Sequence, residues 1–112
     1  LDGTSFMEQK SIRKEVYYDH EIGWAELYKI PKYPDRVWIR AGYYLDLNKT
    51  KNFAKTMYAI AEIFDHVKEA GIDTLYCHAD SQESFNFNLR LGFEPTFEII
   101  PDQGLEFMKV EL

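Results

Sequence analysis

The sequence is poor in cysteine and has no long hydrophobic run. Cys77 is the only cysteine in 112 residues, so no disulfide can form within the chain. Such usage is typical of a reducing compartment, and we therefore expect a cytoplasmic protein. No apolar run approaches the roughly 20 residues that a membrane-spanning helix needs, and no signal-peptide pattern is visible. These absences argue against a membrane-embedded or disulfide-stabilised protein.

Positive charge and metal-ligand patterns are also scarce. Lys and Arg total 13 against 19 Asp and Glu, which gives a net charge of −6. Nucleic acids and anionic membranes attract basic surfaces, so neither is expected as a partner. His20, His66 and His78 lack the spacing of a metal site, and no metal is expected. Glycine-rich dinucleotide and phosphate-loop patterns are absent.

Aromatic residues, in contrast, are abundant, with two Trp, eight Tyr and eight Phe. This content favours a packed interior over disorder. The length fits one domain, which we assign to residues 12–112. Residues 1–11 carry no usable pattern and are interpreted as an N-terminal extension or as vector-derived residues.

The clearest element is a helix predicted between Asn48 and Gly71. Its apolar residues recur at steps of four and three, which is typical of one helical stripe: Phe53, Met57, Ile60, Phe64 and Val67. Three further residues are expected to widen the stripe: Ala54, Tyr58 and Ala61. Asn52 is predicted to cap the first turn, and Gly71 to adopt the left-handed conformation that ends many helices.

Strand patterns flank this helix on both sides. Residues 36–45 and 72–79 alternate apolar and polar side chains, so a strand–helix–strand unit with parallel strands is expected. Ligands often bind where such a strand gives way to its helix, here near residues 45–56. Further strands are predicted at 12–19, 22–30, 96–100 and 105–112, with turns at 31–35 and 101–104.

Residues 80–92 carry conflicting signals. Five apolar residues alternate strictly with polar or small ones, which favours a strand: Phe85, Phe87, Leu89, Leu91 and Phe93. Asp80 with Glu83 three positions later resembles a capping box, and Gly92 suits a helix end. The local pattern leaves strand and helix about equally favoured.

The order of these elements resembles the GNAT N-acetyltransferase superfamily without its first strand and first two helices. The likeness covers residues 12–112 and is carried by two stretches, EIGWAEL at 21–27 and VKEAGIDTLYCHADSQESFNFNLRLGFEP at 67–95, which closes on the family's LGFE. The resemblance implies a helix at 80–92. It implies an α/β (α+β) fold with a mixed, mostly antiparallel sheet of about six strands and two helices.

The family binds acetyl-coenzyme A at the start of its long helix, which the resemblance places on six residues: Lys51, Asn52, Phe53, Ala54, Lys55 and Thr56. Its thioester lies along the preceding strand end, here Leu45, Asp46 and Leu47. Ala54 and Thr56 replace glycines that let backbone N–H groups approach the pyrophosphate. Lys49, Lys51 and Lys55 would supply positive charge there. The alternative is an exposed lysine face that binds nothing.

Catalysis needs a base for the amine and a proton for the leaving thiolate. By resemblance the base is His78 or Glu26, with Asp46 as a third candidate. Asn88 stands where many family members carry the proton-donating Tyr, and asparagine is not a proton donor. Water or another side chain would take that role, with Ser84, Tyr76 and His78 nearby.

Two functions follow as expectations. The first is acetyl-coenzyme A dependent N-acetyltransfer to an amine of a small molecule or protein. The second is an inactive GNAT-like binding or assembly module, virus-encoded or accessory, whose exposed tyrosines would cover a partner: Tyr17, Tyr18, Tyr33, Tyr43 and Tyr44. A cavity between the third and fourth strands favours the enzyme. A missing first strand leaves a sheet edge, through which a homodimer is expected.

Overall fold

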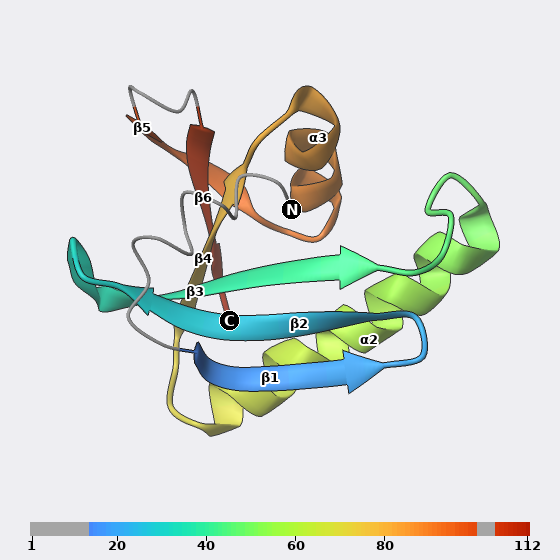
Figure 1. Ribbon diagram of the computed structural model, residues 1–112, viewed down its shortest axis with the longest axis horizontal. Coiled ribbons are helices and arrows are strands. Elements are labelled where there is room, and N and C mark those ends of the chain that lie inside the picture. Colours follow the sequence, from blue (N-terminus) through green and yellow to red (C-terminus); the bar gives the residue numbers. More distant parts are fainter. Residues whose placement is uncertain (1–13, 101–104) are drawn as a thin grey trace.

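The computed structural model describes residues 14–100 and 105–112, which form six strands and two helices (Figure 1). In chain order these are β1 (Lys14–His20), β2 (Gly23–Ile30), β3 (Tyr33–Tyr43), α2 (Thr50–Glu69), β4 (Thr74–Ala79), α3 (Gln82–Arg90), β5 (Glu94–Ile100) and β6 (Leu105–Glu111). The strands make one sheet in the order β1-β2-β3-β4-β6-β5. The predicted turn at 101–104 and the extension at 1–11 lie outside the described residues.

The sheet is antiparallel except for the pair β3 and β4, which confirms the predicted mixed, mostly antiparallel α+β fold. The two parallel strands share only two register pairs, Val37 with Leu75 and Trp38 with Tyr76. Beyond Trp38, β3 continues to Tyr43 on a separate course from β4, and Figure 1 shows the two strands running apart. The sheet therefore opens at the carboxyl ends of its central strands.

Both helices pack on one face of this sheet. The buried cluster beneath them joins Leu27, Ile39 and Leu75 of three strands to Val67 of α2 and Phe93, which follows α3. The opposite face carries a second cluster around Trp38, which is fully buried. The Trp38 and Phe107 ring centroids lie 4.6 Å apart at 68°. The predicted division of β3 and β4 into two faces is confirmed.

Helix α2 follows its predicted stripe only in part. Ile60 and Val67 are buried and Gly71 has φ 92°, as predicted. The expected widening of the stripe is wrong, because three of its residues are exposed: Ala54, Tyr58 and Ala61. Thr56 and Ile63 turn toward the sheet instead. The predicted Asn52 cap is also wrong, because Lys49 is the N-cap and makes no side-chain capping bond.

The ambiguous segment at 80–92 is the helix α3. Its N-cap is Ser81, whose Oγ accepts a hydrogen bond from the Ser84 backbone N–H at 3.1 Å, while Ser84 Oγ accepts from the Ser81 N–H at 3.2 Å. The capping box is real but begins one residue later than the predicted pair of Asp80 and Glu83. Gly92 has φ 102° and ends the helix, so the end signals overrode the strand-like alternation.

The turn before β3 is shorter than predicted. Ile30 pairs with Tyr33, so Pro34 lies within the strand, and β3 ends at Tyr43, before Leu45. In the described part of the chain, β1 and β5 are the sheet edges. Self-association through such an edge stays a prediction.

Gly23 supports the pairing of β2 with β3 through close backbone contact. A Cβ at this position would overlap the carbonyl oxygen of Gly42 on the neighbouring strand. We expect Gly23→Ala to lower the free energy of unfolding by about 1–3 kcal/mol, the usual cost of overpacking a fixed site. Urea denaturation measures this change. Glu62→Ala, at an exposed position of α2, is the control and should change the free energy of unfolding by no more than about 0.5 kcal/mol. An equal loss in both variants would contradict the close-contact argument.

Candidate functional site

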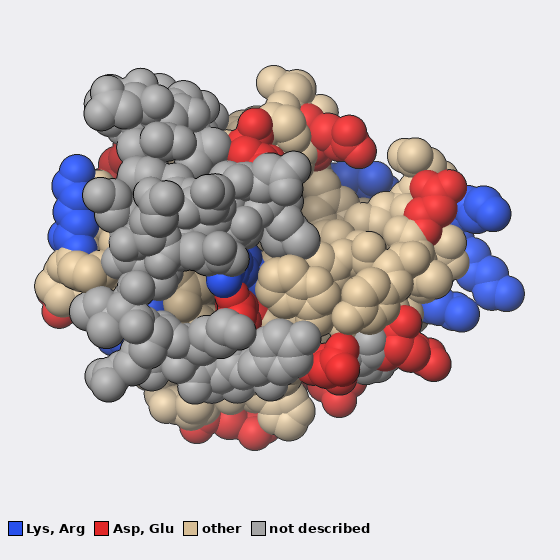
Figure 2. All heavy atoms as spheres, in the orientation of Figure 1, with Lys and Arg blue, Asp and Glu red and all other residues tan. Residues whose placement is uncertain are grey.

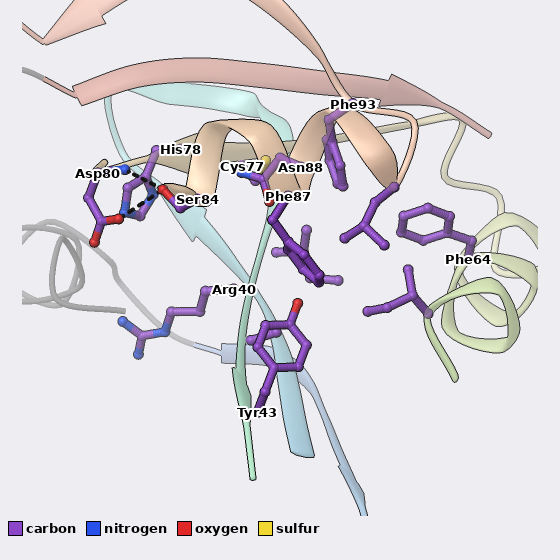
Figure 3. Close-up of a pocket in the computed structure, with 14 residues that line it drawn as sticks. Arg40, Tyr43, Phe64, Cys77, His78, Asp80, Ser84, Phe87, Asn88 and Phe93 are labelled. Atoms are coloured by element: carbon purple, nitrogen blue, oxygen red, sulfur yellow. Dashed lines mark hydrogen bonds between the residues drawn. The ribbon is translucent and has the colours of Figure 1, made fainter. Parts of the chain in front are cut away.

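A cavity of about 120 Å³ occupies the opening between β3 and β4 (Figure 3). Side chains from both strands, both helices and the following loops line it: Ile39, Arg40, Ala41, Tyr43, Ile60, Phe64, Cys77, His78, Asp80, Ser84, Phe87, Asn88, Leu91 and Phe93. Because the strands share only two register pairs, side chains rather than backbone bonds fill the space beyond them.

Polar groups gather at one end of the cavity. Figure 3 shows His78, Asp80 and Ser84 together there, with Ser84 Oγ donating a hydrogen bond to Asp80 Oδ1 at 3.0 Å. Ser84 Oγ also accepts from the Asp80 backbone N–H at 3.1 Å. These bonds fix the hydroxyl and the carboxylate side by side at the start of α3.

His78 is held neutral in this cluster. Burial lowers its pKa from 6.5 to about 4, an effect that Asp80 opposes and Arg40 reinforces. Its Nδ1 atom is buried and has no hydrogen-bond partner within residues 14–100 and 105–112. A neutral imidazole with an open ring nitrogen is suited to accept a hydrogen bond, whereas its burial makes it a weak base.

A larger groove of about 720 Å³ lies between the start of α2 and α3. Tyr43, Asp80, Ser84 and Phe87 line both this groove and the cavity, so the two spaces meet at these residues. The remaining groove residues come from the loop before α2, from α2 and from α3: Leu47, Asn48, Phe53, Ser81, Glu83, Asn86 and Arg90. The site is therefore a long open groove that leads to a small inner cavity.

Cations border the groove at two places. The Arg90 guanidinium lies 3.7 Å from the centroid of the Phe53 ring and leaves α3 at its last turn. Three exposed lysines lie in or next to the first turns of α2: Lys49, Lys51 and Lys55. Basic side chains gather at the edge of the space-filling view where α2 begins (Figure 2). This local positive charge contrasts with the net charge of −6.

The residues predicted to hold the coenzyme occupy different positions. Leu47 and Phe53 line the groove, and the Phe53 ring meets Phe87 edge-on with centroids 5.6 Å apart. Asn52 Nδ2 donates to the Asp46 carbonyl at 3.0 Å, and Asp46 Oδ1 accepts from the Asn48 N–H at 3.0 Å. These two bonds hold the loop that forms one wall of the groove.

The other predicted coenzyme residues do not line the groove. Thr56 is 1% exposed, donates from Oγ1 to the Asn52 carbonyl, and faces the sheet next to Tyr18 and Ile22. Ala54 is exposed, and Leu45 is half-buried outside both the groove and the cavity. Lys51 and Lys55 are solvent-exposed and do not line the groove.

Two of the three predicted catalytic residues meet in the cavity. His78 and Asn88 both line it, and Asn88 Nδ2 lies 3.7 Å from Met108 Sδ. Glu26 lies outside the cavity lining; it is 2% exposed and forms an ion pair with Arg40, which does line the cavity. This buried pairing already satisfies the Glu26 carboxylate, so Glu26 does not face the cavity as the predicted base.

Sequence reasoning missed Tyr43 and Arg90 as site residues. Burial raises the pKa of Tyr43 well above its usual value of 10, so its hydroxyl stays protonated where groove and cavity meet. Burial likewise raises the pKa of Cys77 above its usual range, which keeps it a thiol and supports its predicted role as a core residue. Tyr43 and Arg90 end their strand and helix, positions that sequence periodicity does not distinguish.

No protein-family model matches this sequence, and no curated protein is significantly similar to it. In the described segments no cluster of three or more His, Cys, Asp or Glu is arranged to hold a metal ion. Neither described helix is both long enough and apolar enough to span a membrane.

The lowered pKa of His78 predicts a pH-dependent stability. Between pH 6.5 and 4 the unfolded chain binds a proton at His78 that the folded chain excludes, so the free energy of unfolding falls as pH decreases through this window. We expect His78→Gln to remove about 1–2 kcal/mol of the loss between pH 7 and pH 5. Urea denaturation at both pH values measures it. The control variant His66→Gln, at an exposed position, should lose as much free energy of unfolding between pH 7 and pH 5 as the wild-type chain. If His78→Gln also shows the wild-type pH dependence, the burial of His78 is contradicted.

Proposed function

We propose that the chain is a GNAT-like N-acetyltransferase that transfers an acetyl group from acetyl-coenzyme A to an amine. The observation that carries the proposal is the opening between β3 and β4, which joins a cation-bordered groove at the start of α2 to a cavity containing a neutral histidine. A groove of about 720 Å³ is within the range that encloses a cofactor-sized ligand. Arg90 in the groove and His78 in the cavity suit a ligand with anionic phosphates at one end and a reactive thioester at the other.

The phosphates would bind through side-chain cations rather than through a glycine-rich loop. Arg90 offers guanidinium N–H groups at the groove wall, and the exposed Lys51 and Lys55 add a longer-range positive field at the start of α2. Thr56 does not obstruct this arrangement, because its branched side chain is buried against the sheet and points away from the groove. The replacement of the family's second glycine is therefore compatible with a bound diphosphate.

The reaction forms a C–N bond and breaks the thioester C–S bond, and the chain must move a proton and stabilise the carbonyl oxygen. His78, whose Nδ1 is unpartnered in the described residues, accepts a hydrogen bond that orients the attacking amine, and the proton that the amine loses passes to solvent. Tyr43 donates a hydrogen bond from a hydroxyl that stays protonated. Ser84, held by Asp80, lies where the thiolate would leave and can pass it a proton that is replaced from solvent. Asn88 takes no part in proton transfer.

The acceptor would be an amine of a small molecule or a protein. Asp80 and Glu83 place two carboxylates along the groove near its meeting point with the cavity. Carboxylates at this position attract a protonated amine and favour it over a neutral or anionic acceptor.

The rival function, an inactive assembly module, loses part of its support. Three of the tyrosines expected to be exposed are packed: Tyr18 against His66, Tyr33 against Trp38 and Phe107, and Tyr43 against Phe87. Tyr44 is exposed, and the side chain of Tyr17 lies outside the described set. A single exposed tyrosine in this group is ordinary for a folded domain and does not define a docking surface.

Calorimetric titration with acetyl-coenzyme A tests the proposed groove. We expect micromolar binding by the wild-type chain and at least about tenfold weaker binding by Asn86→Trp, because an indole at this exposed groove position fills the space. Gln82→Trp is the matched control. It loses the same Gln82–Asn86 hydrogen bond and adds the same side chain one turn earlier, away from the groove lining.

Equal binding by both tryptophan variants would place the coenzyme elsewhere. If the wild-type chain binds no acetyl-coenzyme A at millimolar concentration, the enzyme proposal fails, and the inactive module becomes the better account. Release of free thiol in the presence of an amine such as spermidine then distinguishes binding from turnover in any chain that does bind.

The lysines give a separate, salt-dependent prediction. We expect the double variant Lys51→Gln with Lys55→Gln to weaken coenzyme binding by roughly threefold to tenfold at 50 mM salt and to flatten its dependence on salt, because exposed charges act through a screened field. Lys68→Gln, at the other end of the same helix, is the control. Identical salt slopes for wild-type and double variant would show that the lysine face does not contact the ligand.

A further inference from the structure

The inner part of the cavity between β3 and β4 is an apolar chamber. Away from His78 and Ser84 its walls are aliphatic and aromatic side chains from the sheet, from both helices and from the strand after α3: Ile39, Ala41, Ile60, Phe64, Phe87, Leu91 and Phe93. Ile60 is 7% exposed and Phe93 is 5% exposed, so the chamber reaches into the core. Figure 3 shows the polar residues at one end and Phe64 and Phe93 at the other.

Such a chamber is unsuited to water and suited to a small apolar group. A water molecule in a cavity needs two to four polar partners, whereas an apolar cavity of about 150 Å³ stays dry and binds a guest the size of benzene. The whole cavity, with its polar end included, measures about 120 Å³. By that comparison its apolar part holds a few carbon atoms, more than the single methyl group of an acetyl donor.

The position of the chamber matches the acyl group of a bound thioester. Tyr43 and Phe87 mark the point where groove and cavity meet, and His78 and Ser84 stand beside it. A thioester carbonyl at this point would direct its coenzyme portion along the groove and its acyl chain into the chamber. His78 and Arg40 lie at the end where the amine would enter, apart from the apolar walls.

We propose that this site takes acyl groups longer than acetyl, with butyryl as the best fit, and transfers them to the amine. The inference rests on the proposed acyl transfer and concerns its donor. The amine forms a C–N bond to the acyl carbon and loses a proton to solvent, the C–S bond breaks, and the leaving thiolate takes a proton through Ser84 from solvent, so that the coenzyme leaves as its thiol. Acetyl-coenzyme A remains a donor, but one that leaves most of the chamber empty.

The far wall sets the upper limit of chain length. The Phe64 and Phe93 rings meet edge-on with centroids 5.9 Å apart and close the chamber. Each methylene group of the acyl chain that moves from water into the chamber raises the affinity about fourfold. An acyl chain longer than the chamber must displace these two rings, which lowers the affinity. We therefore expect the affinity to rise from the acetyl through the propionyl to the butyryl thioester and to fall for the octanoyl thioester.

Calorimetric titration of the whole chain with free coenzyme A and with its acetyl, propionyl, butyryl and octanoyl thioesters tests this order. We expect butyryl to bind roughly tenfold or more tightly than acetyl. Ala41→Leu, which fills the chamber, should remove the gain along the series, and Ala61→Leu, the same change at an exposed site on α2, should keep it. Phe64→Leu enlarges the chamber and should move the optimum toward octanoyl, which provides a second test should Ala41→Leu fail to fold.

The possible results distinguish failure of this inference from failure of the proposed acetyl transfer. If all the thioesters bind with equal affinity, or if the affinity falls as the acyl group becomes longer than acetyl, the proposal of a longer acyl donor is overturned. The proposal of acetyl transfer is unaffected by that result. Failure of every thioester and of free coenzyme A to bind overturns both. If butyryl binds best and neither Ala41→Leu nor Phe64→Leu changes this optimum, the acyl chain of the ligand lies outside the chamber. That result would also overturn the inference.

Discussion

The brief pairing of β3 with β4 is the constraint on which the rest of the site depends. These two central strands share only Val37 with Leu75 and Trp38 with Tyr76, so their carboxyl ends cannot close the sheet by backbone hydrogen bonds. The gap must then be filled by side chains, and α2 and α3 supply them from one face. This filling leaves a cavity that joins the groove at the start of α2, so the candidate site follows from the short pairing of these two strands.

The two sides of the sheet contribute differently to this arrangement. On the face opposite the helices, the Trp38 cluster and the buried pair of Glu26 with Arg40 hold β2 and β3 together. Breaking such a pair leaves an uncompensated buried charge, which typically costs several kcal/mol. Arg40 reaches the cavity from this side and, with burial as the larger cause, keeps the pKa of His78 low. The acidic chain thus keeps the cavity histidine neutral, while three exposed lysines lie at the start of α2.

Much of the fold was predictable from sequence because its signals are local. The step-of-four stripe predicted α2, Gly71 its end, and alternation in β3 predicted that Ile39 and Trp38 face opposite clusters. The errors arose where tertiary contacts decide. Strict alternation at 85–93 could not separate a helix from a strand until the Ser81 cap was known, and helical spacing could not show that Thr56 rather than Tyr58 faces the sheet. The nearness of His78 and Asn88 in the cavity, and the roles of Tyr43 and Arg90, depend on the divergence of two strands, which no periodicity encodes.

The most direct test of this account is a nitrogen–proton correlation spectrum of the labelled chain, recorded while coenzyme A is added. The account predicts chemical-shift changes that follow the groove and the strand opening, from the amides of residues 43–53 to those of 80–90, with the exposed end of α2 near Lys68 unchanged. Changes confined to the lysine side of α2, or spread over the sheet without a maximum at the opening, would contradict the claim that the divergence of β3 and β4 forms the binding site.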